Sequence, residues 1–236
     1  FPGHEGVEMV EVDGGNGNGN GRVPEGWEIR PFSEIADVLS GGTPKTKVPE
    51  YWNGEIPFFS PKDHNGSFFI SQTERYITKL GLNKCNSKLY PPNTVFITAR
   101  GTVGKVIMPS VHMAMNQSCY ALQGRDGVHQ LYIFLSIMNH VEQLKQRAHG
   151  AVFDTIIVDT FSKLEIVKPP PNILNEFVTK VEPIFDLIRN LLDKNANLRQ
   201  TRDLLLPRLI SGELDVSHIP VAEVSLPRSP HTTNTR

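Results

Sequence analysis

Residues 100–105 read Arg-Gly-Thr-Val-Gly-Lys, a glycine-rich run with a basic side chain at each end. Loops of this kind can bind phosphate, because backbone amides and a lysine surround the phosphate oxygens. A nucleotide-binding Walker A loop also needs glycine at the position of Ala99 and serine or threonine at the position of Val106. The run therefore argues against nucleotide hydrolysis. It fits a plain hairpin turn, or a turn that presents Arg100 and Lys105 to a phosphate backbone.

The sequence lacks several patterns typical of catalytic sites. No Asp or Glu is followed two positions later by Lys, so the carboxylate-x-lysine end of a common nuclease metal site is absent. The run by which amino-methyltransferases hold a flipped base, Asn or Asp followed by Pro-Pro and an aromatic residue, is absent too. The eight histidines are scattered without the spacing of metal ligands. We therefore expect a non-catalytic chain with no metal site and no cofactor of its own.

Basic and aromatic residues alternate between Lys45 and His64, in a segment that contains Trp52, Phe58 and Phe59. In a nucleic-acid interface, Lys and Arg neutralise phosphates while amide or imidazole groups read base edges. The alternative is that the aromatic residues form core and the lysines are merely solvated. The pair Asn116-Gln117 offers the same choice, because amides suit adenine but are also common in turns. The candidate DNA-binding residues are Lys45, Lys47, Lys62, His64, Asn65, Arg100, Lys105, Asn116 and Gln117.

Charge and composition set broad limits on function. The 236-residue chain has a net charge of −1, whereas nucleic-acid-binding domains usually carry an excess of Lys and Arg. The stretch from Arg75 to Lys105 nevertheless contains only basic charges, so one face can still be basic. No apolar run is long enough to span a bilayer and no secretory signal is visible, which predicts a cytoplasmic protein without membrane contact. Free thiols are expected at Cys85 and Cys119, although the sequence leaves a disulfide open.

The candidate residues fall among short strands and tight turns. We predict a strand over 94–98 that pairs across the turn at 100–102 with a strand over 103–108. Further strands are expected over 113–122 and 164–167, and an amphipathic helix over 130–147. Because residues 14–21 consist only of glycine and asparagine, residues 1–22 are predicted to be a flexible linker. The expected class is α+β, with a strand-rich domain over 23–170.

A heptad pattern of mostly apolar residues follows this domain. It consists of Leu174, Phe177, Val181, Ile184, Ile188, Leu191, Asn195, Leu198, Arg202, Leu205 and Leu209. The pattern predicts a long helix over 171–212 that pairs with another helix, and polar Asn195 and Arg202 would specify the register. The alternative is that the helix lies on its own domain. Pro183 is expected to kink or divide the helix, and residues 213–236 are expected to form a C-terminal tail.

The order of several short segments resembles that of the DNA-specificity (S) subunit of type I restriction-modification systems. The resemblance covers about residues 24–216. The segments that carry it are Gly26-Trp27-Glu28, Ser40-Gly41-Gly42-Thr43-Pro44, Glu50-Tyr51-Trp52, Ile56-Pro57-Phe58, the run from Thr98 to Lys105, Asn116-Gln117, and the run from Arg202 to Leu214.

This resemblance implies a target-recognition domain that reads one half of a bipartite DNA site, followed by a spacer helix. Full-length members have two such domains and two helices that pair antiparallel. They dock two modification (methyltransferase) subunits and, through them, restriction subunits. S-adenosylmethionine, ATP and magnesium would belong to those partner subunits. This chain has one domain and one helix, so it is expected to be either a half-size subunit that pairs with a second copy or the C-terminal half of a longer one.

Within this picture we expect Lys45, Lys47, Arg100 and Lys105 to contact phosphates. His64, Asn65, Asn116 and Gln117 are candidates for base edges, and further base-reading residues are expected within 62–86. Two other classes of function remain open. One is a coiled-coil adaptor that binds protein rather than DNA, and the other is an enzyme with a pocket that the sequence does not reveal.

Overall fold

The computed structural model describes residues 8–12, 21–148, 155–215 and 217. The chain divides into two compact units, Phe1–Asp186 and Leu187–Arg236. The division falls inside the long C-terminal helix, whereas the sequence pattern placed the domain boundary at residue 170, just before that helix. The two units are therefore described separately below.

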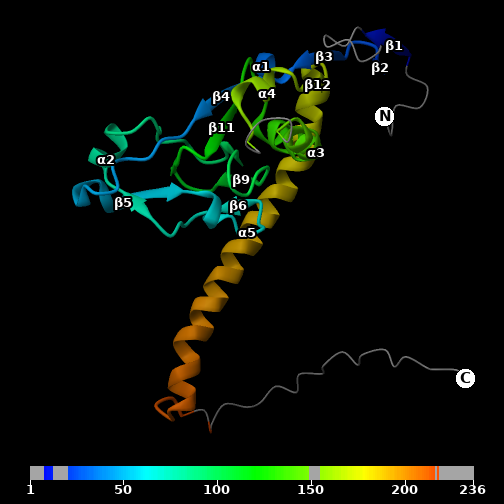
Figure 1. The fold of residues 1–236 in the computed structure, drawn as a ribbon. Helices are drawn as coiled ribbons and strands as arrows, with labels where there is room; N and C mark the ends of the chain where they lie inside the picture. The colour runs from blue at the N-terminus through cyan, green and yellow to red at the C-terminus, as the bar shows by residue number, and fades with distance from the viewer. Residues whose placement is uncertain (1–7, 13–20, 149–154, 216, 218–236) are drawn as a thin grey trace, which may run out of the picture. The chain divides into compact units, whose positions relative to one another are not determined.

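A five-stranded sheet forms the centre of the first unit (Figure 1). Its strands, in spatial order, are β4 (Ala36–Ser40), β11 (Cys119–Gly124), β8 (Val95–Thr98), β9 (Val106–Pro109) and β6 (Phe69–Ile70). Neighbours are antiparallel except for β9 and β6. All four residues of β8 are buried, as its β-branched and aromatic composition favours. The predicted pairing of β8 with β9 across the turn at 100–102 is confirmed.

The prediction of one strand over 113–122 is wrong. The segment forms two strands, β10 (Ala114–Met115) and β11, which belong to different sheets. Between them the side-chain Oδ1 of Asn116 accepts a hydrogen bond from the backbone N–H of Ser118 at 3.0 Å. An asparagine that bonds the backbone two residues on stabilises a turn, so Asn116 ends one strand and reverses the chain before the next.

A three-stranded sheet holds β10, β5 (Trp52–Phe59) and β7 (Tyr76–Ile77) in that order. Short helical turns flank it: η1 (Pro49–Tyr51), η2 (Pro61–Asp63) and α2 (Lys79–Asn83). Phe59 at the end of β5 pairs with Met115 of β10. Both residues belong to a buried hydrophobic cluster that also contains side chains from the five-stranded sheet. The two sheets are thus joined through the end of β5.

The remaining strands form two antiparallel pairs. The pair of β3 (Glu28–Pro31) and β12 (Glu165–Lys168) lies next to α1 (Phe32–Ile35) and α4 (Val158–Ser162) in the chain. In the other pair, β1 (Met9–Val12) bonds to β2 (Gly21–Pro24). The prediction of a flexible linker over 1–22 is therefore wrong for 9–12 and 21–22, because the alternating Met-Val-Glu-Val segment can pair with 21–24. Residues 13–20, which carry the glycine-rich run, lie outside the described part of the chain.

Two helices complete the described structure. The amphipathic helix α3 (Gln130–Ala148) forms where predicted and buries Phe134 and Leu144. Helix α5 (Pro171–Ile210) begins at a proline, which suits the first position of a helix because that N–H has no helical partner. Helix α5 continues through Pro183 without a break, so the predicted division there is wrong. Within the part of the chain that the structure describes, no helix is both long and apolar enough to cross a membrane.

The first turns of α5 pack within the first unit. Leu174 is buried, and the ring of Phe177 meets that of Tyr132 on α3 edge-on, with centroids 6.1 Å apart. Phe185 is also buried, stacked on Phe68 at 5.8 Å. The alternative that the helix lies on its own domain therefore holds for this part. In the second unit, Leu191, Leu198, Leu205 and Leu209 of the heptad pattern are exposed.

Candidate nucleic-acid interface

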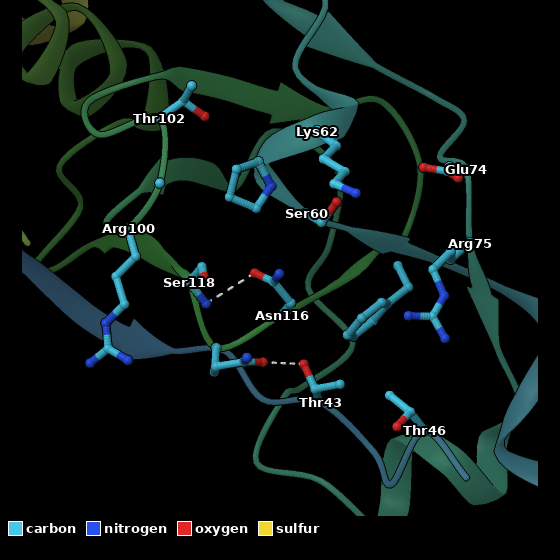
Figure 2. A pocket seen from close by; sticks show the side chains of 14 residues that line it. Thr43, Thr46, Ser60, Lys62, Glu74, Arg75, Arg100, Thr102, Asn116 and Ser118 are labelled. Atoms are coloured by element: carbon cyan, nitrogen blue, oxygen red, sulfur yellow. Dashed lines mark hydrogen bonds between the residues drawn. The ribbon is translucent and has the colours of Figure 1, made fainter. Parts of the chain in front are cut away.

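A cleft of about 760 Å³ opens in the first unit (Figure 2). Its walls come from five segments that are distant in sequence: 43–46, 58–62, 74–75, 100–102 and 116–118. Lys62, Arg100, Asn116 and Gln117, all predicted DNA-binding residues, line it together. In the view of Figure 2, Arg100 and Arg75 lie on opposite sides of the cleft. The fold thus brings basic and amide side chains from separate loops to one concave surface.

The turn that carries Arg100 is held by the buried residue Thr98. The Thr98 hydroxyl donates to the carbonyl of Thr102 and accepts from the backbone N–H of Lys105 at 3.0 Å. Gly104 has φ of +80°, a conformation that glycine adopts without strain, and its N–H donates to the carbonyl of Thr98 at 2.8 Å. The glycines of the run therefore shape a hairpin turn. Arg100 lines the main cleft, whereas Lys105 lines a separate cavity of about 260 Å³.

The turn at 116–118 orients two amide side chains. Asn116 Oδ1 accepts from the Ser118 N–H and, at 3.4 Å, from the Cys119 thiol. Gln117 Oε1 accepts a hydrogen bond from the hydroxyl of Thr43. A bidentate contact to adenine requires both an acceptor and a donor on the amide. Because the oxygen of Asn116 already accepts two hydrogen bonds, its NH₂ group is the part that remains for a ligand.

Two close contacts hold this turn against the end of β4. The N–H of Gly41 donates to the carbonyl of Cys119 at 3.2 Å, and that of Gly42 donates to the carbonyl of Met115 at 3.1 Å. A Cβ atom on Gly41 would overlap the carbonyl oxygen of Asn116. Glycine is therefore required at Gly41 because the two backbones meet there.

The other predicted residues lie away from the main cleft. Lys45 and Lys47 are exposed in the loop that precedes η1. Thr43 and Thr46 of the same loop line the cleft. Asn65 stabilises its own turn, since its Oδ1 accepts from the Ser67 N–H at 3.0 Å. His64 lines the smaller cavity together with Lys105.

Burial lowers the pKa of His64 below its ordinary value of 6.5, and the positive charge of Lys105 adds to this effect. Hydrogen bonds to the backbone of Val106 and of His64 itself oppose the shift without cancelling it. The neutral imidazole is therefore the form that the fold favours, and its Nδ1 accepts from the Gly66 N–H at 3.2 Å.

A pH dependence of stability follows for His64. Below pH 6.5 the unfolded chain binds a proton at this position that the folded chain resists, so stability falls as the pH falls. We expect the stability advantage of the wild type over a His64→Gln variant to shrink as the pH is lowered from 7.5 towards 5. Urea unfolding of both proteins across this range measures the effect, and parallel curves would contradict it.

The structure adds Arg75 to the site, a residue that lies within the predicted base-reading range 62–86 but was not named there as a candidate. Its guanidinium lies 3.5 Å from the centroid of the Trp52 ring, and its side chain lines the cleft. Arg75 is the first residue of the stretch that lacks acidic side chains, and this was the available signal. The threonines and serines of the cleft, by contrast, are single polar residues in loops and had no sequence signal.

Between Lys45 and His64, the sequence left open whether the aromatic residues form core or part of a nucleic-acid face. The structure shows that they form core. Trp52, Phe58 and Phe59 are 8%, 3% and 0% exposed, although Phe58 also touches the cleft. Both cysteines are free thiols. Burial raises the pKa of the Cys119 thiol, so Cys119 remains protonated and can donate to Asn116. In the described ranges, no group of three His, Cys, Asp or Glu side chains is placed to hold a metal ion.

The family model for the type I restriction modification DNA specificity domain matches residues 24–200. The chain belongs to this family. The matched residues include every segment that lines the cleft. The resemblance inferred from the short sequence segments is thereby confirmed.

Two specificity subunits of type I restriction enzymes are similar in sequence to this chain. The type I restriction enzyme HindI specificity subunit of Haemophilus influenzae is 33% identical over 210 residues, which cover 88% of this chain and 46% of that protein. The MjaIX specificity subunit of Methanocaldococcus jannaschii is 30% identical, covering 76% of this chain and 43% of that protein. The specificity-domain chain thus spans somewhat less than half the length of these relatives.

Solved structures share the fold. The HsdS subunit from Thermoanaerobacter tengcongensis matches with a TM-score of 0.54 at 18% identity, over 81% of this chain and 46% of that one. The type I restriction-modification S subunit from M. genitalium matches with a TM-score of 0.58 at 16% identity, over 78% and 46%. The predicted fold class, a strand-rich domain followed by a long helix, is thereby confirmed.

Proposed function

We propose that this chain is a non-catalytic DNA-binding part of a type I restriction-modification specificity subunit and that it reads one half of a bipartite site. The observation that carries the proposal is the cleft, in which side chains from separate loops of the specificity domain converge. Lys62, Arg75 and Arg100 supply positive charge there, against the single carboxylate of Glu74. A concave surface rich in hydrogen-bond donors suits the phosphates and base-edge acceptors of duplex DNA.

Different residues of the cleft suit different parts of the duplex. Lys62 and Arg100 are exposed, as residues that neutralise phosphates must be. Asn116 and Gln117 have their amide oxygens engaged within the protein, which leaves NH₂ donors for base-edge acceptors. Lys45 and Lys47 extend from the loop next to the cleft and add further phosphate contacts. Lys105, His64 and Asn65 would meet the duplex beyond it, if the DNA also covers the smaller cavity.

Family membership supports a proposal for the partners of this chain. A methyltransferase subunit would dock on this chain, and restriction subunits would join through the complex, in the cytoplasm. S-adenosylmethionine, ATP and magnesium would be bound by those subunits. The exposed leucines of the second unit support pairing of the helix with a second copy or with the other half of a longer subunit.

The exposed leucines also favour a second candidate function. A chain whose helix pairs with another protein, while its globular unit never meets DNA, would be a coiled-coil adaptor. The salt dependence of DNA binding separates the two functions, because an adaptor would show no electrostatic release of counterions.

We expect a Lys62→Gln/Arg100→Gln double variant to bind random duplex more weakly than the wild type. The slope of log K against log salt concentration should fall by about 2, since each lost phosphate contact removes about 0.9. The measurement is a salt titration of duplex affinity by the chain assembled with its methyltransferase subunit. A Lys88→Gln/Lys194→Gln variant removes the same charge from exposed positions outside the cleft and should retain the slope. Equal losses in both variants would show that the cleft is not the DNA face.

A further inference from the structure

The side chain of Arg75 is more constrained than an exposed arginine usually is. Its backbone carbonyl accepts from the N–H of Phe58 at 3.0 Å and from the hydroxyl of Thr73 at 2.7 Å. Its guanidinium lies 3.5 Å from the centroid of the Trp52 ring. Trp52 is buried and is itself fixed edge-on against Phe58, with centroids 5.5 Å apart. The plane of the guanidinium is therefore supported by core residues before any ligand arrives.

Asp63 fastens the segment that contains Arg75 to the loop that contains Lys62. Its Oδ2 accepts from the N–H and the hydroxyl of Ser60, at 2.8 and 2.7 Å. Its Oδ1 accepts from the N–H of Glu74 at 2.7 Å. One carboxylate thus joins two walls of the cleft and sets where residues 74 and 75 stand relative to Lys62.

Arg75 also differs from several other exposed arginines in its ion pairs. Arg30, Arg125 and Arg202 each form a salt bridge with a nearby carboxylate. Among the residues that the structure describes, no carboxylate is paired with Arg75, although Glu74 is its neighbour. The N–H groups on the edge of its guanidinium are therefore free to meet an acceptor in the cleft.

We propose that Arg75 reads a guanine of the DNA half-site, and that Trp52 and Asp63 are positioning residues for it. This inference rests on the proposed function. Guanine presents two adjacent acceptors, O6 and N7, in the major groove, and the guanidinium fork matches both at once. A stacked and anchored arginine loses little conformational entropy when it contacts guanine. The entropy cost of ordering the side chain therefore does not offset its preference for guanine over other bases.

The surroundings of Arg75 favour a base over a phosphate. Glu74 lines the same cleft, and its negative charge would repel a phosphate brought close to Arg75. A carboxylate can instead accept from the N4 amino group of cytosine, the partner of guanine. A lysine contacts phosphate as a point charge without a fixed orientation, so the exposed Lys62 is suited to that role. The pair of Glu74 and Arg75 therefore matches the edge of a G·C pair.

The test is selection of binding sequences from a random duplex pool by the chain assembled with its methyltransferase subunit. The recovered half-site should contain a G·C pair that depends on Arg75. We expect Arg75→Lys, which keeps the charge but loses the fork and its plane, to reduce discrimination at that pair by about tenfold to a hundredfold. Affinity for random duplex should change less than threefold. Lys62→Gln is the matched contrast, because a lost phosphate contact weakens binding to all sequences alike.

A second comparison tests the positioning residues. Trp52→Phe and Asp63→Asn should each weaken discrimination at the same G·C pair in the wild type, but add no further loss when Arg75 is already lysine. A purely structural role would lower binding in both backgrounds. If Arg75→Lys leaves the selected sequence unchanged, or weakens random and selected duplexes equally, Arg75 does not read a base. If the wild type itself selects no sequence, the proposed function has failed rather than this inference.

Discussion

Replacing Phe185 by alanine is expected to lower the free energy of unfolding of the first unit by about 3–5 kcal/mol, the usual range for a buried phenylalanine. Phe185 is only 5% exposed, and its ring contacts those of Phe68, Phe69 and Phe134 at centroid distances of 5.7–6.1 Å. Removing it would leave a cavity between α5, α3 and the segment that leads into β6. Urea unfolding followed by circular dichroism measures the loss.

Ile184 supplies the matched control because it is the neighbouring residue on the same helix and is 56% exposed. An Ile184→Ala substitution should change stability by no more than about 0.5 kcal/mol, as substitutions at exposed positions usually do. Equal losses for the two variants would mean that the helix does not pack on the first unit through Phe185.

Replacing Gly41 by alanine is expected to destabilise the first unit by about 3 kcal/mol or more, as overpacking against an immovable neighbour does. The new Cβ would overlap the carbonyl oxygen of Asn116, which is backbone and has no alternative rotamer. Relief requires the turn at 116–118 to move, and that turn carries Asn116 and Gln117 into the cleft. We therefore expect a loss of duplex affinity together with the loss of stability, measured by urea unfolding and by DNA titration.

Gly101 provides the contrast for Gly41, since it also lies in a turn that lines the cleft. It has φ of +80°, and a Cβ added there would meet no atom within 4 Å. A Gly101→Ala variant should lose only about 1 kcal/mol, the strain of an L-residue in the left-handed region. If Gly41→Ala is no more harmful than Gly101→Ala, the close approach of β4 to the turn does not constrain the fold.

The sequence predicted best those elements that have a strong local signal. The helix over 130–147 was predicted because its apolar residues recur at helical spacing, and the strand over 94–98 because its residues are β-branched or aromatic. The turn at 100–102 was predicted because a glycine between two strand-like segments is a typical turn signal. Lys62, Arg100, Asn116 and Gln117 were predicted as residue types suited to DNA, but the sequence did not indicate that the fold places them in one cleft.

The failures have physical causes. The strand predicted over 113–122 looked continuous because its apolar residues extend across Asn116, and one side-chain hydrogen bond was enough to end it. The heptad rule selected the exposed Ile184 and passed over the buried Phe185, because a straight helix has 3.6 residues per turn and drifts from a strict seven-residue repeat. Arg75 was not singled out within the range 62–86, because its contact with Trp52, 23 positions away in sequence, could not be predicted from the sequence.

The walls of the cleft consist almost entirely of connecting segments; of its lining residues, Phe58 alone belongs to a strand. The hydrogen-bonded sheets beneath contribute the frame, and β8 is buried along its whole length. Changes in the loops can therefore accumulate without loss of the fold. This division makes the molecule evolvable. Descendants of one ancestral scaffold could come to recognise unrelated sequences through substitutions confined to the loops.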